Sequence, residues 1–356
     1  MKKAYLVLNN GRVFEGTRVG ADGDGLGELV FTTGMTGYLE TLTDPSYAGQ
    51  IILQTFPLIG NYGVIPADFE GPCLAKGYVV RELCETPSNF RSEYALDAFL
   101  KEHKVPGICG VDTRALTRII REEGVMNALI CDEVPTDLTT IQSYAVLGGV
   151  KQASSTEPHV FPAEGEENHH VALLDYGAKH HIVESLTERG CRVTVLPHDT
   201  TAEDVMALHP DGLMLSNGPG DPKENVFEIE QLKKLMGKLP VFGICLGHQL
   251  AALALGGETV KLKYGHRGAN QPVKDLKTGR CFITSQNHGY AVVAESISDI
   301  AELRYINAND FSCEGLDYPE AKCFTVQFHP EASAGPHDTG FLFDRFVSMM
   351  GGEDHA

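Results

Sequence analysis

The 356-residue chain has no run of about 20 consecutive apolar residues, so the sequence predicts no membrane-spanning helix. The apolar run at 4–8 near the amino terminus is too short for a signal peptide and predicts a first strand instead. The chain also lacks the pattern Gly-x-x-x-x-Gly-Lys-Ser/Thr, so we expect no P-loop ATP site. Without an export signal, we expect a cytoplasmic protein.

Positive charge is scarce as well. The 29 lysines and arginines stand against 48 aspartates and glutamates, which gives a formal net charge of −19. An acidic surface disfavours nucleic acids and anionic membranes as partners. We therefore expect neither kind of partner.

The cysteines form neither a disulfide framework nor a zinc pattern. There are nine, an odd number at irregular spacing, and no Cys-x-x-Cys pair occurs. The segment 22–25 is similar to the start of a calcium loop, but Leu26 breaks the ligand pattern. The pairs His169-His170 and His180-His181 are adjacent in sequence, so their side chains do not share a helix face. We therefore expect reduced thiols and no metal site.

One cysteine, Cys245, lies in a Gly-x-Cys-x-Gly sequence after an expected strand at 240–244 and before a helical run at 250–255. This arrangement is typical of a nucleophile elbow, in which glycines keep bulk away from an exposed nucleophile. The amino terminus of the new helix directs free amides at the sulfur, which favours the reactive thiolate. The backbone amide of Leu246 can also donate to an oxyanion. We expect the other eight cysteines to be small buried apolar residues.

A candidate base follows a second expected strand, at 324–328. His329 comes directly after this strand, and Glu331 stands two residues further on. The imidazole would take the thiol proton, and the carboxylate would orient the ring and stabilise its charged form. A third segment, 216–222, follows an apolar strand with a turn of Asn, Gly, Pro and Asp. Alone it is an ordinary turn, but together with Cys245 and His329 it fits an oxyanion hole.

The polar, proline-containing segment 154–168 predicts a linker between two domains. After it, expected strands at 171–176, 192–196, 212–215 and 240–244 alternate with helical segments such as 179–189. This alternation predicts an α/β fold with a doubly wound, mostly parallel sheet. The β-type runs and few helical segments of the amino-terminal half predict a separate mixed α/β domain with a largely antiparallel sheet. In open α/β sheets, ligands bind at the carboxyl ends of the strands, where Gly218 and Cys245 are expected.

The segments 216–222, 243–249 and 328–333 resemble, in order and spacing, the three signatures of class I glutamine amidotransferases. The resemblance covers about residues 170 to 350. It implies that Cys245 is the nucleophile, His329 the base and then acid, and Glu331 the orienting acid in the hydrolysis of glutamine to glutamate and ammonia. It also implies that backbone amides near Gly218 and from Leu246 bind the oxyanion.

The amino-terminal segments 31–38, 42–50, 57–63 and 110–114 resemble the first domain of the carbamoyl-phosphate synthetase small-subunit family. The combined resemblance spans nearly the whole chain. It implies a family domain at 1–150, a linker at 151–169 and a class I glutamine amidotransferase domain at 170–352. The first domain would contact a partner and give one wall of the glutamine pocket.

The resemblance also implies the glutamine contacts, and they include one residue of the first domain. Tyr290 stands where we expect phenylalanine. The segment 287–290 is expected in a polar turn after a strand at 281–284. The implied contacts are Ser46, Gly218, Gly220, Leu246, Gln249, Asn287, Gly289 and Tyr290.

The implied partner is a separate large subunit, in a heterodimer or higher assembly, that makes carbamoyl phosphate from ammonia, bicarbonate and ATP. We expect no cofactor in this chain, with ATP and magnesium on the large subunit. Two alternatives stay open: the glutaminase component of another synthase, and a non-catalytic regulatory subunit. The amino-terminal segments disfavour the first, and the intact Cys, His and Glu disfavour the second. The sequence leaves open whether arginine or pyrimidine synthesis is served.

Overall fold

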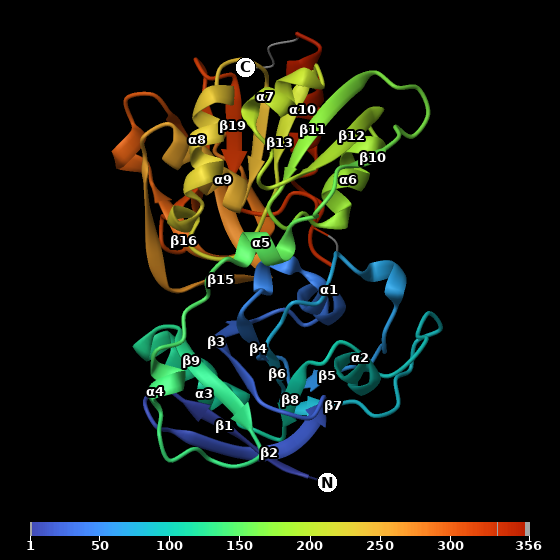
Figure 1. The fold of residues 1–356 in the computed structure, drawn as a ribbon, viewed down its shortest axis with the longest axis vertical. Helices are drawn as coiled ribbons and strands as arrows, with labels where there is room; N and C mark the ends of the chain where they lie inside the picture. Colours follow the sequence, from blue (N-terminus) through green and yellow to red (C-terminus); the bar gives the residue numbers. More distant parts are fainter. Residues whose placement is uncertain (1, 333, 353–356) are drawn as a thin grey trace. The chain divides into compact units, whose positions relative to one another are not determined.

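A computed structural model describes residues 2–332 and 334–352, which form two compact units (Figure 1). The first unit spans Met1–Leu147 and the second Gly148–Ala356. The segment 151–169, predicted as a linker, contains part of helix α5 (Gly149–Ala153) and strand β10 (His159–Phe161), which pairs with a strand of the second unit. No helix in the described part of the chain is both long and apolar enough to cross a membrane.

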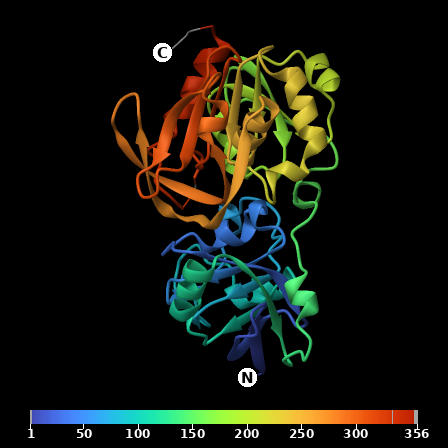
Figure 2. The same cartoon turned by 90° about the vertical axis from the view of Figure 1, so that its left-hand side faces the viewer.

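The first unit is built around a closed barrel (Figure 2). Its strands, in order around the barrel, are β1 (Lys3–Leu8), β2 (Val13–Gly20), β8 (Pro106–Cys109), β6 (Gly77–Val79), β4 (Gln50–Gln54), β3 (Gly25–Thr32) and β9 (Met126–Cys131). Short elements complete the unit: α1 (Tyr38–Thr43), η1 (Pro45–Tyr47), β5 (Leu58–Ile59), η2 (Pro66–Asp68), β7 (Glu82–Leu83), α2 (Leu96–Glu102), α3 (Thr113–Glu123) and α4 (Thr139–Gln142).

The prediction of a mixed α/β domain is confirmed, but the expectation of a largely antiparallel sheet is wrong. The neighbours β3–β4, β4–β6 and β6–β8 pair in parallel, whereas the other barrel pairs are antiparallel. A parallel pair needs a crossover connection. Between β3 and β4 the crossover runs through α1 and η1, whose short helical segments carry too few residues to show a period of their own.

The second unit has one ten-stranded sheet. Its order is β10, β12 (Cys191–Pro197), β11 (His169–Asp175), β13 (Gly212–Leu215), β14 (Val241–Ile244), β19 (Cys323–Val326), β18 (Cys313–Tyr318), β17 (Glu302–Asn307), β15 (Glu258–Asp275) and β16 (Cys281–Val293). The five strands from β12 to β19 are parallel, and the pairs on either side of them are antiparallel. The parallel part confirms the predicted strands and their alternation with helices.

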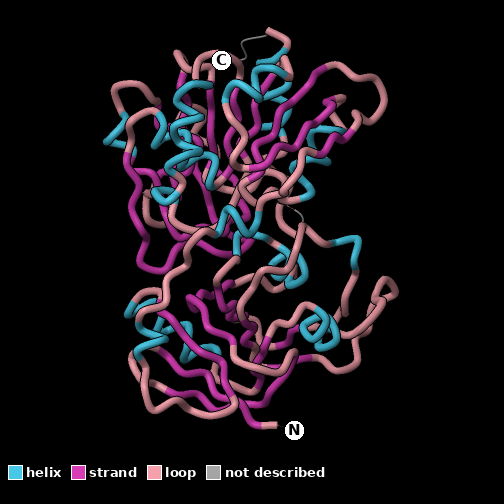
Figure 3. The backbone as a smooth tube through the Cα atoms, in the orientation of Figure 1, coloured by secondary structure: helices cyan, strands magenta, loops and turns pink. Residues whose placement is uncertain are grey.

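Helices cover both faces of this parallel part (Figure 3). Along β11, Ala172 and Leu174 pack in a cluster with α8 (Val226–Leu235) and α9 (Leu246–Ala254). Val171 and Leu173 pack in a second cluster with α6 (His180–Thr187) and α10 (Phe341–Met350). Because successive side chains of a strand point to opposite faces, a strand covered on both faces needs apolar residues at every position. The helices are α6 (His180–Thr187), α7 (Ala202–Ala207), α8 (Val226–Leu235), α9 (Leu246–Ala254) and α10 (Phe341–Met350), with η3 (Pro222–Glu224) and η4 (Ala294–Ile297) between them.

Candidate active site

Cys245 occupies a sharp turn between the end of β14 and the start of α9. It has φ 52° and ψ −102°, a conformation rare for a residue with a side chain, and its amide donates to Val326 O at 2.8 Å. The flanking glycines are needed for steric reasons. A Cβ on Gly247 would lie 2.4 Å from Leu215 O, and one on Gly243 would lie 3.0 Å from the backbone of Gly247. The backbone of β13 therefore passes too close to α9 for any larger residue.

His329 and Glu331 follow β19, the strand next to β14. A backbone bridge fixes this segment, because the His329 amide donates to Ser285 O at 2.9 Å. The His329 Nδ1–H donates to Glu331 Oε1 at 2.7 Å, and Cys245, His329 and Glu331 are all buried. Because the Nδ1–H donates a hydrogen bond to the carboxylate, Nε2 is the nitrogen that remains to interact with the Cys245 thiol. Among the residues that the structure describes, none lies in hydrogen-bonding geometry with His329 Nε2.

The charges around the imidazole favour its protonated form. Burial and the nearby Lys179 ammonium lower the pKa of His329, but the Glu331 carboxylate and the Cys245 thiol outweigh them and raise it to about 10. Burial also opposes the charge on Glu331, yet His329 and Lys179 bring the pKa of that carboxyl down to about 2. The arrangement therefore holds a charged imidazole beside the thiol, as an activated cysteine nucleophile requires.

The turn after β13 packs against the elbow. A Cβ on Gly218 would lie 2.4 Å from Tyr176 O and 2.7 Å from Leu246 Cδ2, so this position has room only for glycine. Ser216 Oγ accepts from the Tyr176 amide at 2.9 Å and donates to Asn217 O at 2.8 Å. These bonds tie the turn to the carboxyl end of β11. Gly220, with φ 90°, completes the turn in the left-handed region that glycine favours.

Strand β16 runs past the elbow and contacts it through two groups. Cys245 Sγ lies 3.7 Å from Asn287 O, and Gln249 Nε2 donates to Tyr290 O at 2.9 Å. The expectation that 287–290 form a turn after a strand ending at 284 is wrong, because β16 continues to Val293. The strand persists because these residues pair with β15; Asn287, for example, faces Arg267. Gly289 lies between Asn287 and Tyr290 on the same strand.

Two family models match the chain. Residues 172–349 match class-I glutamine amidotransferases, and residues 6–130 match the CPSase domain of the carbamoyl-phosphate synthase small chain. A carbamoyl phosphate synthase small chain from Oceanobacillus iheyensis is 50% identical over 100% of this chain and 100% of the relative. Small chains from Listeria monocytogenes and Bacillus cereus are also 50% identical, over 100% and 98% of this chain and 99% and 96% of the relatives.

The chain belongs to the carbamoyl phosphate synthase small chain family. This confirms the family resemblance seen in the sequence, and it holds for both halves of the chain. Because the match includes residues 6–130, it also disfavours the glutaminase component of another synthase.

Not all predicted site residues of this family member come together within one unit. The second unit places Gly218, Leu246, Gln249, Asn287 and Tyr290 around Cys245 through the contacts given above. Ser46 belongs to the first unit, where it lies buried in η1 and its amide donates to Asp44 Oδ1 at 2.9 Å. A role for Ser46 in glutamine binding therefore stays a prediction.

Several residues of the site were missed in the sequence. The buried Lys179 lies with its Nζ 3.5 Å from Glu331 Oε1, and Gln327 Oε1 accepts from Gln249 Nε2 at 2.9 Å. Asn217 Oδ1 accepts from the Lys179 amide at 3.2 Å. A lysine immediately before a helix gives no local signal of burial, because its ion pair partner lies far away in sequence. Gln327 directly follows the apolar strand β19 and stands two residues before His329, so a polar residue at this place was the one available signal in the sequence.

Proposed function

We propose that this chain hydrolyses the side-chain amide of glutamine and supplies the ammonia to a large subunit that makes carbamoyl phosphate. The observation that carries the proposal is the buried ion pair between His329 Nδ1 and Glu331 Oε1, which lie 2.7 Å apart. The pair follows the strand next to the one that ends at the strained turn of Cys245. Membership of the small chain family supports the same substrate and the same partner.

In the proposed reaction, the Cys245 thiolate attacks the amide carbon of glutamine and forms a tetrahedral oxyanion. Backbone amides near Gly218 and from Leu246 donate to this oxygen. His329 gives its proton to the departing nitrogen, so ammonia leaves and a glutamyl thioester remains. A water molecule, deprotonated by the now neutral His329, attacks the thioester and releases glutamate with the free thiol.

The remaining chemistry is proposed for the partner. The chain has no P-loop sequence, so ATP and magnesium would be bound by the large subunit, where ammonia combines with bicarbonate. The rest of the glutamine molecule would be held by candidates in the second unit: Gly220, Gln249, Asn287, Gly289 and Tyr290. A reducing compartment such as the cytoplasm suits a thiolate nucleophile, and we propose that location.

Replacement of Cys245 by serine tests the proposed division of labour. In the assembled complex, Cys245→Ser should abolish glutamine-dependent synthesis of carbamoyl phosphate and leave ammonia-dependent synthesis at the wild-type rate. The exposed Cys281 provides a matched control, because Cys281→Ser should change neither activity. Loss of both activities in the Cys245 variant, with normal subunit assembly, would contradict the proposal.

A further inference from the structure

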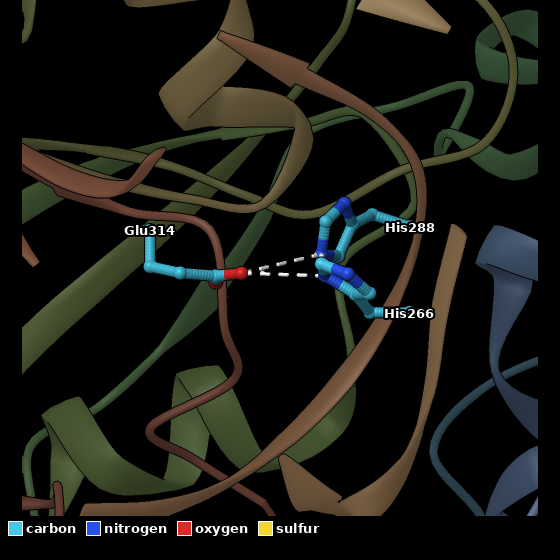
Figure 4. A group of neighbouring side chains, drawn as sticks. All are labelled: His266, His288 and Glu314. Carbon is cyan, nitrogen blue, oxygen red and sulfur yellow. Dashed lines mark hydrogen bonds and ion pairs between the residues drawn. The ribbon is translucent and has the colours of Figure 1, made fainter. Parts of the chain in front are cut away.

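Outside the triad, three buried side chains from three antiparallel strands meet in one cluster: His266 on β15, His288 on β16 and Glu314 on β18 (Figure 4). His266 Nδ1 lies 3.2 Å from His288 Nε2 and 3.3 Å from Glu314 Oε1. His288 Nε2 lies 3.9 Å from the same carboxylate oxygen. Figure 4 shows the carboxylate pointing at both rings.

The outer nitrogen of each ring is already committed to an acceptor. His288 Nδ1 lies 2.8 Å from Tyr290 O, and His266 Nε2 lies 2.9 Å from Asp310 Oδ2. Carbonyl and carboxylate oxygens only accept, so both outer nitrogens carry a hydrogen. When both rings are neutral, the inner nitrogens His266 Nδ1 and His288 Nε2 therefore carry no hydrogen, and each presents a lone pair.

A further acceptor lies beside His288 Nε2. Gln286 Nε2 donates to Glu314 Oε2 at 3.0 Å, which leaves Gln286 Oε1 at 3.2 Å from His288 Nε2. Asn307 Nδ2 is a donor at the edge of the cluster, but at 3.3 Å from Glu314 Oε1 and 3.5 Å from His266 Nδ1 its contacts are long. Two nitrogen lone pairs and two oxygen acceptors thus lie close together, an arrangement that a single cation would satisfy.

We propose that His266 Nδ1, His288 Nε2 and Glu314 Oε1 bind one zinc ion, with Gln286 Oε1 or a water molecule as fourth ligand. At zinc–ligand distances of about 2.0–2.1 Å, tetrahedral ligand atoms lie roughly 3.3 Å apart. The separations of His266 Nδ1 from His288 Nε2 and from Glu314 Oε1 match this value. The separation between His288 Nε2 and Glu314 Oε1 would have to shorten by about half an ångström. Histidine and carboxylate are zinc ligands, and an outer carboxylate such as Asp310 on a ligating histidine is typical of zinc sites.

The competing occupant is a proton on His266. A proton at His266 Nδ1 would be shared between His288 Nε2 at 3.2 Å and Glu314 Oε1 at 3.3 Å, whereas one metal ion would bind Gln286 Oε1 as well. Metal binding would displace this proton.

The site would have a structural effect on the glutaminase centre. His288 lies between Asn287 and Gly289 on β16, and Tyr290 O accepts from both His288 Nδ1 and Gln249 Nε2. A bound ion would join β15, β16 and β18 next to the elbow. Zinc binding is measured directly and does not depend on the proposed glutaminase activity.

The test uses the full chain with Cys245→Ser, which removes the thiol as a competing ligand. After stripping with a chelator, dialysis against zinc and washing, zinc is counted by mass spectrometry. We expect one zinc ion per chain, a higher melting temperature with zinc, and a tetrahedral ligand-field spectrum when cobalt(II) replaces zinc. The added substitution Glu314→Gln should remove all three signals. No retained zinc in the Cys245→Ser chain would overturn the proposal, as would equal retention after Glu314→Gln.

Two further substitutions guard against loss of the fold. Asp310 is exposed, so Asp310→Asn leaves the core intact and should weaken zinc binding by about 10- to 100-fold. His170, a buried histidine of the same sheet that contacts Thr194 Oγ1 at 2.8 Å, is the matched control. His170→Gln should retain the full zinc content. Unchanged affinity in Asp310→Asn, or equal zinc loss in His170→Gln, would count against the site.

Discussion

Replacing Glu331 by glutamine keeps the shape of the side chain and removes the negative charge beside His329. In the wild-type chain, burial and Lys179 lower the pKa of His329, while Glu331 and the thiol raise it to about 10, above the ordinary 6.5. Without the carboxylate, burial and Lys179 still act, so the pKa should fall below 6.5. The pKa of His329 should thus fall from about 10 to below 6.5, which corresponds to on the order of 5 kcal/mol between the two protonation states.

This loss should appear both in turnover and in its pH dependence. Removing the orienting acid of a related triad costs about 10⁴-fold in kcat, and we expect a decrease of about 10³- to 10⁴-fold for Glu331→Gln. In the wild type, the imidazolium persists until the pH rises through about 10. In the variant it is lost as the pH rises through 6.5 or below, so the alkaline limb of the kcat/KM profile should move to lower pH.

A double variant separates the electrostatic effect from damage to the fold. Glu331→Gln alone also removes the ion pair with Lys179, and breaking a buried ion pair costs about 3–5 kcal/mol of stability. Lys179→Met combined with Glu331→Gln should recover much of the melting temperature but not the turnover. An alkaline limb at the wild-type pH in both variants, with kcat within about tenfold of wild type, would refute the reasoning.

Three further changes test other parts of the site. Gly247→Ala places a Cβ 2.4 Å from Leu215 O and should abolish glutaminase activity and lower the melting temperature. Gly340→Ala is the control and should keep full activity, because Gly340 has φ −57° and its Cβ would lie 3.7 Å from His337 O, an ordinary contact. Equal activity of the two variants would contradict the steric argument. Burial lowers the pKa of His248 to about 3, so its contribution to stability is present above pH 6.5 and lost as the pH falls toward 3. The melting temperature of His248→Gln should therefore fall less steeply over this range, and an unchanged slope would show that His248 is not a buried neutral ring. Finally, His329→Ala should lower turnover more than Glu331→Ala, and the opposite order would reverse the two roles.

Regular patterns made the parallel sheet predictable. Strands such as β13 and β14 are covered on both faces and appear as continuous apolar runs, and the helices between them follow within short connections. The barrel of the first unit was less predictable, because its strand order depends on pairings between distant segments. The length of β16 was missed for the same reason, since polar residues such as Asn287 and His288 look like a turn until β15 pairs with them.

The candidate nucleophile, base and acid could be identified from the sequence alone, because the Gly-x-Cys-x-Gly pattern and the residues that follow the strands are local features of the chain. The residues that surround these three side chains are known only from the folded structure. Three sets of contacts join groups from different segments of the chain: Lys179 with Glu331, Gln249 with Tyr290 O, and the cluster of His266, His288 and Glu314. Burial and charge at these contacts set the pKa values, and both depend on which segments pack together rather than on which residues are neighbours along the chain.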